Sequence, residues 1–132
     1  MFIEKYAPVA ALIRKNLEAL GVREGARVLS VDALKGLEIL AKDNSTSKEL
    51  PHAVFLDPPY SNAEDYHRVL SFLGSASLLE EGGLVIAEHR RNFELPETVR
   101  DLLRVRVLRQ GDATLTFYRF LKRDPGSGAA KE

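Results

Sequence analysis

The sequence predicts an α/β protein with a mostly parallel sheet that is closed by an antiparallel hairpin. Segments of strand and helix periodicity alternate along most of the 132 residues, which is the pattern of a parallel sheet covered by helices. Two strand-like segments then follow one another across Gln110-Gly111-Asp112, the composition of a hairpin turn. Acidic residues follow three of the predicted strands, and such sheets bind ligands at the carboxyl ends of their strands.

The elements predicted for the N-terminal half begin and end with apolar strands. In order they are a strand at Phe2-Ile3, a helix from about Pro8 to Leu20, a strand at 26–31, a helix that begins after Asp32, a polar surface loop at 42–50 and a strand at 52–56. The helix at 8–20 has apolar side chains on one face, and Gly21 ends it. The strand at 52–56 is apolar after its first residue, which indicates that both of its faces are covered.

The C-terminal half is predicted to contain two helices and three strands. They are a helix from Asn62 to about Phe72, a turn at 81–83, a strand at 84–87, a short helix at 96–103, and strands at 105–108 and 115–120. The polar residues 123–132 have the composition of a disordered tail. We therefore expect one folded domain at 1–122.

Composition excludes several kinds of protein. The chain has no cysteine, so it has neither disulfides nor thiolate chemistry. Its apolar runs are too short to span a bilayer, and the start of the chain lacks the pattern of a signal peptide, so we expect a cytoplasmic protein. The three histidines are scattered, which predicts surface positions and no metal site; they are His52, His67 and His89.

Basic residues are in excess from residue 86 onward, although the formal net charge of the chain is zero. This excess predicts either a side that faces a polyanion or an ordinary solvated surface. The residues concerned are His89, Arg90, Arg91, Arg104, Arg106 and Arg109.

The motif Asp57-Pro58-Pro59-Tyr60 follows the apolar run that ends at Leu56. Enzymes that methylate the exocyclic amine of a nucleobase place such a motif after a buried strand. The Asp57 carboxylate and the Pro58 carbonyl would accept the amine hydrogens, and proline fixes the direction of the backbone. The ring of Tyr60 would stack on an extruded base, worth about 1–3 kcal/mol. The alternative is a turn that only ends the strand.

Two further acidic residues lie at predicted strand ends. Glu4 would accept the ribose hydroxyls of a nucleoside cofactor, or it is an exposed residue beside Lys5. Asp32 and Ala33 would bracket an adenine, although helix capping explains Asp32 equally well. The sequence leaves both alternatives open.

Several segments together resemble the RsmD family, bacterial enzymes that methylate N2 of a guanine in small-subunit (16S) ribosomal RNA. The resemblance rests on Phe2-Ile3-Glu4-Lys5, on Leu12 to Leu17, on Ala53 to Tyr60 and on Gly111 to Tyr118. It implies a Rossmann-like class I methyltransferase fold, S-adenosyl-L-methionine as cofactor, and the ribosomal RNA or small subunit as partner. It also implies site residues. The catalytic loop would be Asp57, Pro58, Pro59 and Tyr60, and the cofactor site Glu4, Lys5, Asp32 and Ala33, with Glu4 on the ribose.

The chain departs from the family pattern at its start. The family's first strand and its glycine-rich cofactor loop have no counterpart in the sequence, and that strand lies between those matching residues 1–4 and 52–56. We therefore expect a partial methyltransferase domain, either a fragment or a degenerate relative. Two other functions stay open, a catalytically inactive binding module and an adenine-N6 DNA methyltransferase. The oligomeric state is not predicted.

Overall fold

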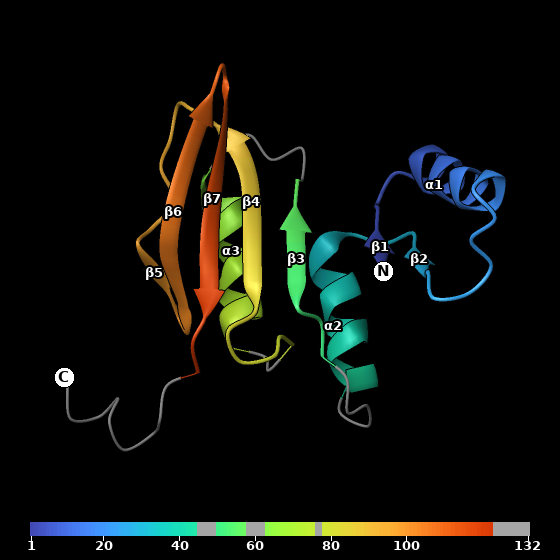
Figure 1. The fold of residues 1–132 in the computed structure, drawn as a ribbon, viewed down its shortest axis with the longest axis horizontal. Helices are drawn as coiled ribbons and strands as arrows, with labels where there is room; N and C mark the ends of the chain where they lie inside the picture. The colour runs from blue at the N-terminus through green and yellow to red at the C-terminus, as the bar shows by residue number, and fades with distance from the viewer. Residues whose placement is uncertain (45–49, 58–62, 76–77, 123–132) are drawn as a thin grey trace. The chain divides into compact units, whose positions relative to one another are not determined.

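The computed structural model describes residues 1–44, 50–57, 63–75 and 78–122 (Figure 1). The chain divides into two compact units, Met1–Lys42 and Asp43–Glu132. Each unit has its own sheet, with helices beside the strands. The α/β class predicted from the sequence is confirmed.

The N-terminal unit holds a parallel pair of short strands and two helices. Its elements are β1 (Phe2–Ile3), α1 (Ala7–Ala19), β2 (Val28–Leu29) and α2 (Ala33–Asn44). Phe2 lies opposite Val28 and Ile3 opposite Leu29. β2 is shorter than the predicted strand at 26–31. α2 extends into the predicted loop at 42–50, and Lys42 in its last turn lies where a cation favours the helix dipole.

Helix α1 ends in a Schellman motif at the predicted glycine. The Gly21 N–H donates to the Glu18 carbonyl at 3.0 Å, and the Val22 N–H donates to the Leu17 carbonyl at 2.9 Å. Gly21 has a φ of 75°, in the left-handed region that glycine adopts without a steric penalty. The motif turns the chain back from the helix toward β2.

Helix α2 begins as the sequence predicts and packs closely on β1. The Asp32 Oδ1 accepts the Lys35 N–H at 2.8 Å, which is the hydrogen bond of an N-cap. One turn later, a Cβ built on Gly36 would lie 2.5 Å from Cγ2 of Ile3. The absence of a side chain at Gly36 therefore allows the close approach of helix and strand.

The C-terminal unit contains a five-stranded sheet and helix α3 (Ala63–Ser75). The strands are β3 (Ala53–Leu56), β4 (Leu84–Arg90), β5 (Thr98–Val99), β6 (Leu102–Gln110) and β7 (Ala113–Phe120), in the order β3-β4-β7-β6-β5. β3 and β4 are parallel, and the other pairs are antiparallel. The sheet is thus mixed, and the predicted hairpin forms β6 and β7.

Helix α3 covers one face of this sheet (Figure 1). Its buried residues are Tyr66, Val69, Leu70, Leu73 and Gly74. On β4 the buried side chains alternate, at Val85, Ala87 and His89, which is the period of a strand with one covered face. Buried residues of β7 lie opposite them. This layer is the core of the unit.

The predicted helix at 96–103 is wrong. Thr98–Val99 form β5, and β6 begins at Leu102 after a reversal in which Arg100 has a φ of 56°. Leu95, Val99 and Leu102 are all buried. Their spacing matches a helical face, but a tight turn between two antiparallel strands brings them to the same core.

The prediction that both faces of the strand at 52–56 are covered is also wrong. Leu56 is buried, whereas Phe55 is 59% exposed. Neighbouring side chains of a strand point to opposite faces, and Phe55 lies opposite Ile86, away from the face that α3 covers. Among the described residues of this unit, α3 is the only helix, and it covers only one face of the sheet. An apolar run in the sequence therefore does not show whether one face or both faces of the strand are buried.

Candidate functional site

The candidate catalytic residue Asp57 lies at the carboxyl end of β3. It directly follows Leu56, which is buried opposite Ala87 of β4, and Asp57 itself is exposed. Pro58, Pro59 and Tyr60 lie outside the described residues. The structure therefore places the first residue of the motif at the edge of the sheet where ligands of α/β folds bind.

An aromatic cluster supports the carboxyl-end part of the neighbouring strand β4. The Tyr66 hydroxyl donates to the Glu88 carbonyl at 2.7 Å. The rings of His89 and Phe93 stack at 5.1 Å between centroids, and Tyr66 and Phe93 meet at 5.7 Å. Tyr66 is a packing residue, since it is 2% exposed. The cluster supports the part of β4 beyond Ala87. Ala87 is the last residue of β4 that pairs with β3, where it lies opposite Leu56.

His89 is buried, so its predicted surface position is wrong. Its Nδ1 lies 2.9 Å from the Arg90 carbonyl and its Nε2 lies 2.7 Å from the Thr116 hydroxyl. A carbonyl only accepts, so Nδ1 carries the proton and Nε2 accepts from Thr116. Burial lowers the pKa of His89, the bond to the Arg90 carbonyl raises it, and the charge of Arg109 lowers it again. His89 is therefore a neutral structural residue.

A period-two pattern in the sequence identifies the position of His89. Val85 and Ala87 are buried, and His89 is the next residue on the same face of β4. The predicted strand ended at Ala87, before polar residues begin. Extending the alternation by two residues would have placed the imidazole inside.

The basic residues after residue 86 do not form one face. Arg104 lies opposite Tyr118 and Arg109 opposite Thr114, and both partners are buried on the side of α3. Arg106 lies opposite Phe117 on the other face, because the register shifts between Arg104 and Arg106. The placement of these three arginines on two faces of β6 favours the alternative of an ordinary solvated surface.

Several of these cations also have partners within the chain. The Arg104 Nη1 donates to the Leu95 carbonyl at 2.9 Å, and Arg109 pairs with Glu94 at 3.1 Å. These contacts hold the side chains of Arg104 and Arg109 against residues of the same unit.

The candidate cofactor residues lie in the N-terminal unit. Glu4 directly follows β1, and Asp32 follows β2 by three residues. Since β1 and β2 are parallel, both carboxylates lie at the same edge of this pair. Lys5 is exposed, and Ala33 is the half-buried first residue of α2.

Each carboxylate has one hydrogen bond to the backbone. Glu4 Oε2 accepts the Tyr6 N–H at 2.8 Å, and Asp32 Oδ1 accepts the Lys35 N–H at 2.8 Å. A carboxylate accepts up to about four hydrogen bonds, so both retain capacity. These two acceptors thus fit a nucleoside whose free hydroxyls donate, and the capping role of Asp32 is compatible with this assignment.

In the parts of the chain that the structure describes, no group of three or more histidine or acidic side chains could hold a metal ion. Over the same residues, no helix is long and apolar enough to cross a membrane.

Comparison with known proteins identifies a family. Residues 1–119 match the family model described as "Conserved hypothetical protein 95". The chain is 31% identical over 119 residues to "Putative rRNA methyltransferase YlbH" of Bacillus subtilis (strain 168), an alignment that covers 90% of this chain and 62% of that protein. The chain thus spans less than two thirds of the length of this curated relative.

Solved structures share the fold. "Putative methyltransferase yhhF" from Escherichia coli matches with a TM-score of 0.72 at 23% identity, over 92% of this chain and 63% of that one. The "putative methylase HI0767" of Haemophilus influenzae matches with a TM-score of 0.70 at 24% identity, over 92% and 71%. These likenesses give the chain a Rossmann-like methyltransferase fold. Together with the family match, they show that the chain belongs to the RsmD family.

Proposed function

We propose that this chain takes part in the S-adenosyl-L-methionine-dependent methylation of guanine N2 in small-subunit (16S) ribosomal RNA. One observation carries the proposal. Asp57, the first residue of an Asp-Pro-Pro-Tyr motif, is exposed at the carboxyl end of a strand within the segment that matches the family. The name of the Bacillus subtilis relative, an rRNA methyltransferase, supports RNA as the substrate.

The chemistry requires the exocyclic amine to become a nucleophile. Its lone pair is delocalised into the ring, and acceptors placed on the amine hydrogens favour a more tetrahedral nitrogen. Asp57 would accept one hydrogen and the Pro58 carbonyl the other, with Pro59 restricting the loop. Tyr60 would stack on the extruded guanine. Positioning of the amine against the methyl donor then accounts for most of the rate.

The cofactor supplies an activated methyl group on a sulfonium. Glu4 would bind the ribose hydroxyls, with Lys5 next to it in the chain. Asp32 and Ala33, at the start of α2, would contact the adenine. The two carboxylates at one edge of β1 and β2 support this assignment.

The test is methyl transfer from labelled S-adenosyl-L-methionine to unmethylated small subunits or their RNA. Asp57→Asn keeps the size of the side chain but loses its charge, and we expect a loss on the order of 100-fold. Asp112→Asn is the matched control, since Asp112 is exposed in the β6–β7 turn of the same unit. Equal rates for Asp57→Asn and wild type would contradict the role of Asp57.

Calorimetry with S-adenosyl-L-methionine separates the enzyme from an inactive binding module. Micromolar binding that is weakened by Glu4→Gln supports the cofactor assignment. No detectable heat, with RNA binding intact, supports the binding module. Replacing the RNA by adenine-containing DNA tests the third function, and transfer to DNA alone would overturn the proposed substrate.

A further inference from the structure

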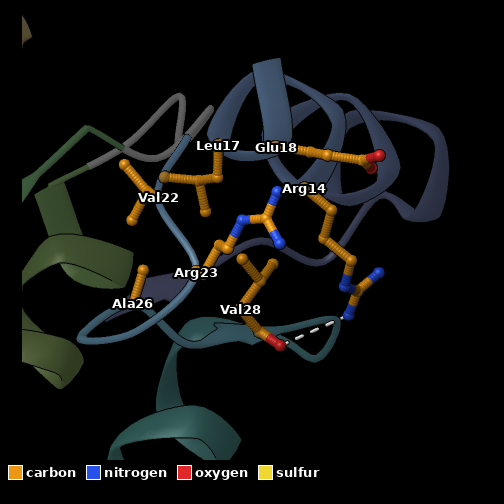
Figure 2. Close-up of a pocket in the computed structure, with 7 residues that line it drawn as sticks. All are labelled: Arg14, Leu17, Glu18, Val22, Arg23, Ala26 and Val28. Carbon is orange, nitrogen blue, oxygen red and sulfur yellow. Dashed lines mark hydrogen bonds between the residues drawn. The ribbon is translucent and has the colours of Figure 1, made fainter. Parts of the chain in front are cut away.

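A pocket lies in the N-terminal unit, away from the candidate cofactor residues. It has a volume of about 540 Å³ and is lined by residues from the end of α1 to the start of β2 (Figure 2). Val28 is the first residue of β2, so the pocket is at the amino end of this strand. Glu4 and Asp32 lie at the carboxyl ends. The pocket is therefore distinct from the candidate cofactor site.

Two arginines provide the polar part of this pocket. The Arg14 Nη2 donates to the Val28 carbonyl at 3.3 Å. This bond holds the guanidinium beside the amino end of β2. Figure 2 shows the guanidinium groups of Arg14 and Arg23 turned into the space between α1 and Val28, and the carboxylate of Glu18 turned away from them. Within the described ranges, neither arginine forms an ion pair. Their charge is thus available to an anion.

The rest of the lining is mainly apolar, with Leu17, Val22, Ala26 and Val28. The Schellman bond from the Val22 N–H to the Leu17 carbonyl fixes two of these residues at the end of α1. Arginine forks bind phosphate oxygens in a bidentate manner. An apolar wall beside them suits the sugar or ring attached to a phosphate. The volume is in the range of about 300–1,000 Å³ that is usual for small-molecule sites.

We propose that Arg14 and Arg23 bind the phosphate group of a nucleotide, and that its source is the RNA strand. The RNA source rests on the proposed function, whereas the phosphate site itself does not. The substrate RNA would then contact the N-terminal unit as well as the candidate catalytic loop. Single strands lose affinity with salt at a slope of about −0.7 per phosphate contact, so loss of this contact changes the salt dependence measurably.

The experiment measures binding of a labelled small-subunit RNA fragment to the full chain by fluorescence anisotropy, at several salt concentrations. We expect Arg23→Gln to weaken binding about tenfold and to reduce the salt slope by up to about 0.7, the full value for one phosphate contact. Arg14→Lys keeps the charge and loses the fork, and we expect it to weaken binding too. Lys15→Gln is the control, because this exposed neighbour on α1 does not line the pocket. Circular dichroism confirms that each variant is folded.

The outcomes separate this site from the proposed function. Loss of RNA binding in the arginine variants alone supports the RNA source, whether or not methyl transfer occurs. Calorimetry with guanosine monophosphate and with inorganic phosphate tests whether the phosphate comes from a free mononucleotide or a free anion. Binding of the mononucleotide alone, lost in Arg23→Gln, would keep the phosphate site and overturn the RNA source. Equal losses for Arg23→Gln and Lys15→Gln, or no binding of any probe by wild type, would overturn the proposal.

Discussion

The contact between Gly36 and Ile3 predicts an unusual result for a glycine-to-alanine substitution within a helix. In an exposed helix, Gly→Ala stabilises by about 1 kcal/mol. At Gly36 the new Cβ would lie 2.5 Å from Cγ2, 2.8 Å from Cδ1 and 3.0 Å from Cγ1 of Ile3. Carbon atoms prefer about 3.5–4.0 Å, so α2 and β1 must separate by roughly 1 Å. Such overpacking costs about 1–3 kcal/mol, and we expect a net loss of about 0–2 kcal/mol.

A double-mutant cycle with Ile3→Ala tests whether the side chain of Ile3 causes the cost of Gly36→Ala. Ile3→Ala removes all three crowded atoms, so it should cost about 1–2 kcal/mol less in the Gly36→Ala background than in wild type. Urea unfolding followed by circular dichroism measures both costs. Additive effects, within about 0.5 kcal/mol, would show that the side chain of Ile3 does not restrict the helix. Because Asp32 begins the same helix, Gly36→Ala should also weaken S-adenosyl-L-methionine binding, measured by calorimetry.

The remaining predictions concern the buried residues of the C-terminal unit. Burial lowers the pKa of His89, so the unfolded chain takes up a proton first as pH falls through 6.5, and stability should fall. Urea midpoints between about pH 7.5 and pH 5.5 should fall less for His89→Gln, and an unchanged pH dependence would contradict the neutral assignment. The Tyr118 hydroxyl donates to the Pro96 carbonyl at 2.6 Å, and Tyr118→Phe should cost about 1–3 kcal/mol by thermal or urea unfolding. Burial raises the pKa of Tyr118 to about 12, so wild-type stability should decline above pH 10, and a similar decline in Tyr118→Phe would contradict this origin.

Local chemistry made part of the fold predictable. Asp32 is an N-cap and Gly21 ends a helix, because a side-chain acceptor and a left-handed backbone are properties of single residues. The β6–β7 hairpin was predictable for the same reason. Gly111, at the first of the two turn positions, has a φ of 61°, which is the glycine position of a type II′ turn.

Features that depend on distant partners were not predictable. The apolar spacing of Leu95, Val99 and Leu102 identified three buried residues but not their backbone, because a tight reversal satisfies the same spacing as a helix. Phe55 belongs to an apolar run, yet its burial depends on which elements cover that face.

The strand ends that carry the candidate site residues were predictable. The hydrogen-bond partners of residues in and near the site were less predictable. The positions of Glu4 and Asp57 at strand ends followed from the apolar runs that directly precede them. The hydrogen bond from the Tyr6 N–H to Glu4 arises from the turn into α1, which the sequence alone does not define. The burial of His89 depends on Thr116, a partner 27 residues away along the chain.

The two kinds of strand pairing in the C-terminal unit should set an order of folding. β6 and β7 are joined by a two-residue loop, and hairpins of this kind form in about 1–10 μs. β3 reaches β4 only after the intervening chain, α3 included, has closed into a loop, an entropic cost that precedes any contact. We therefore expect β3 to join the sheet last and its amides to exchange with solvent before those of β7. Asp57 would then be carried by the strand that is released most readily when the sheet opens.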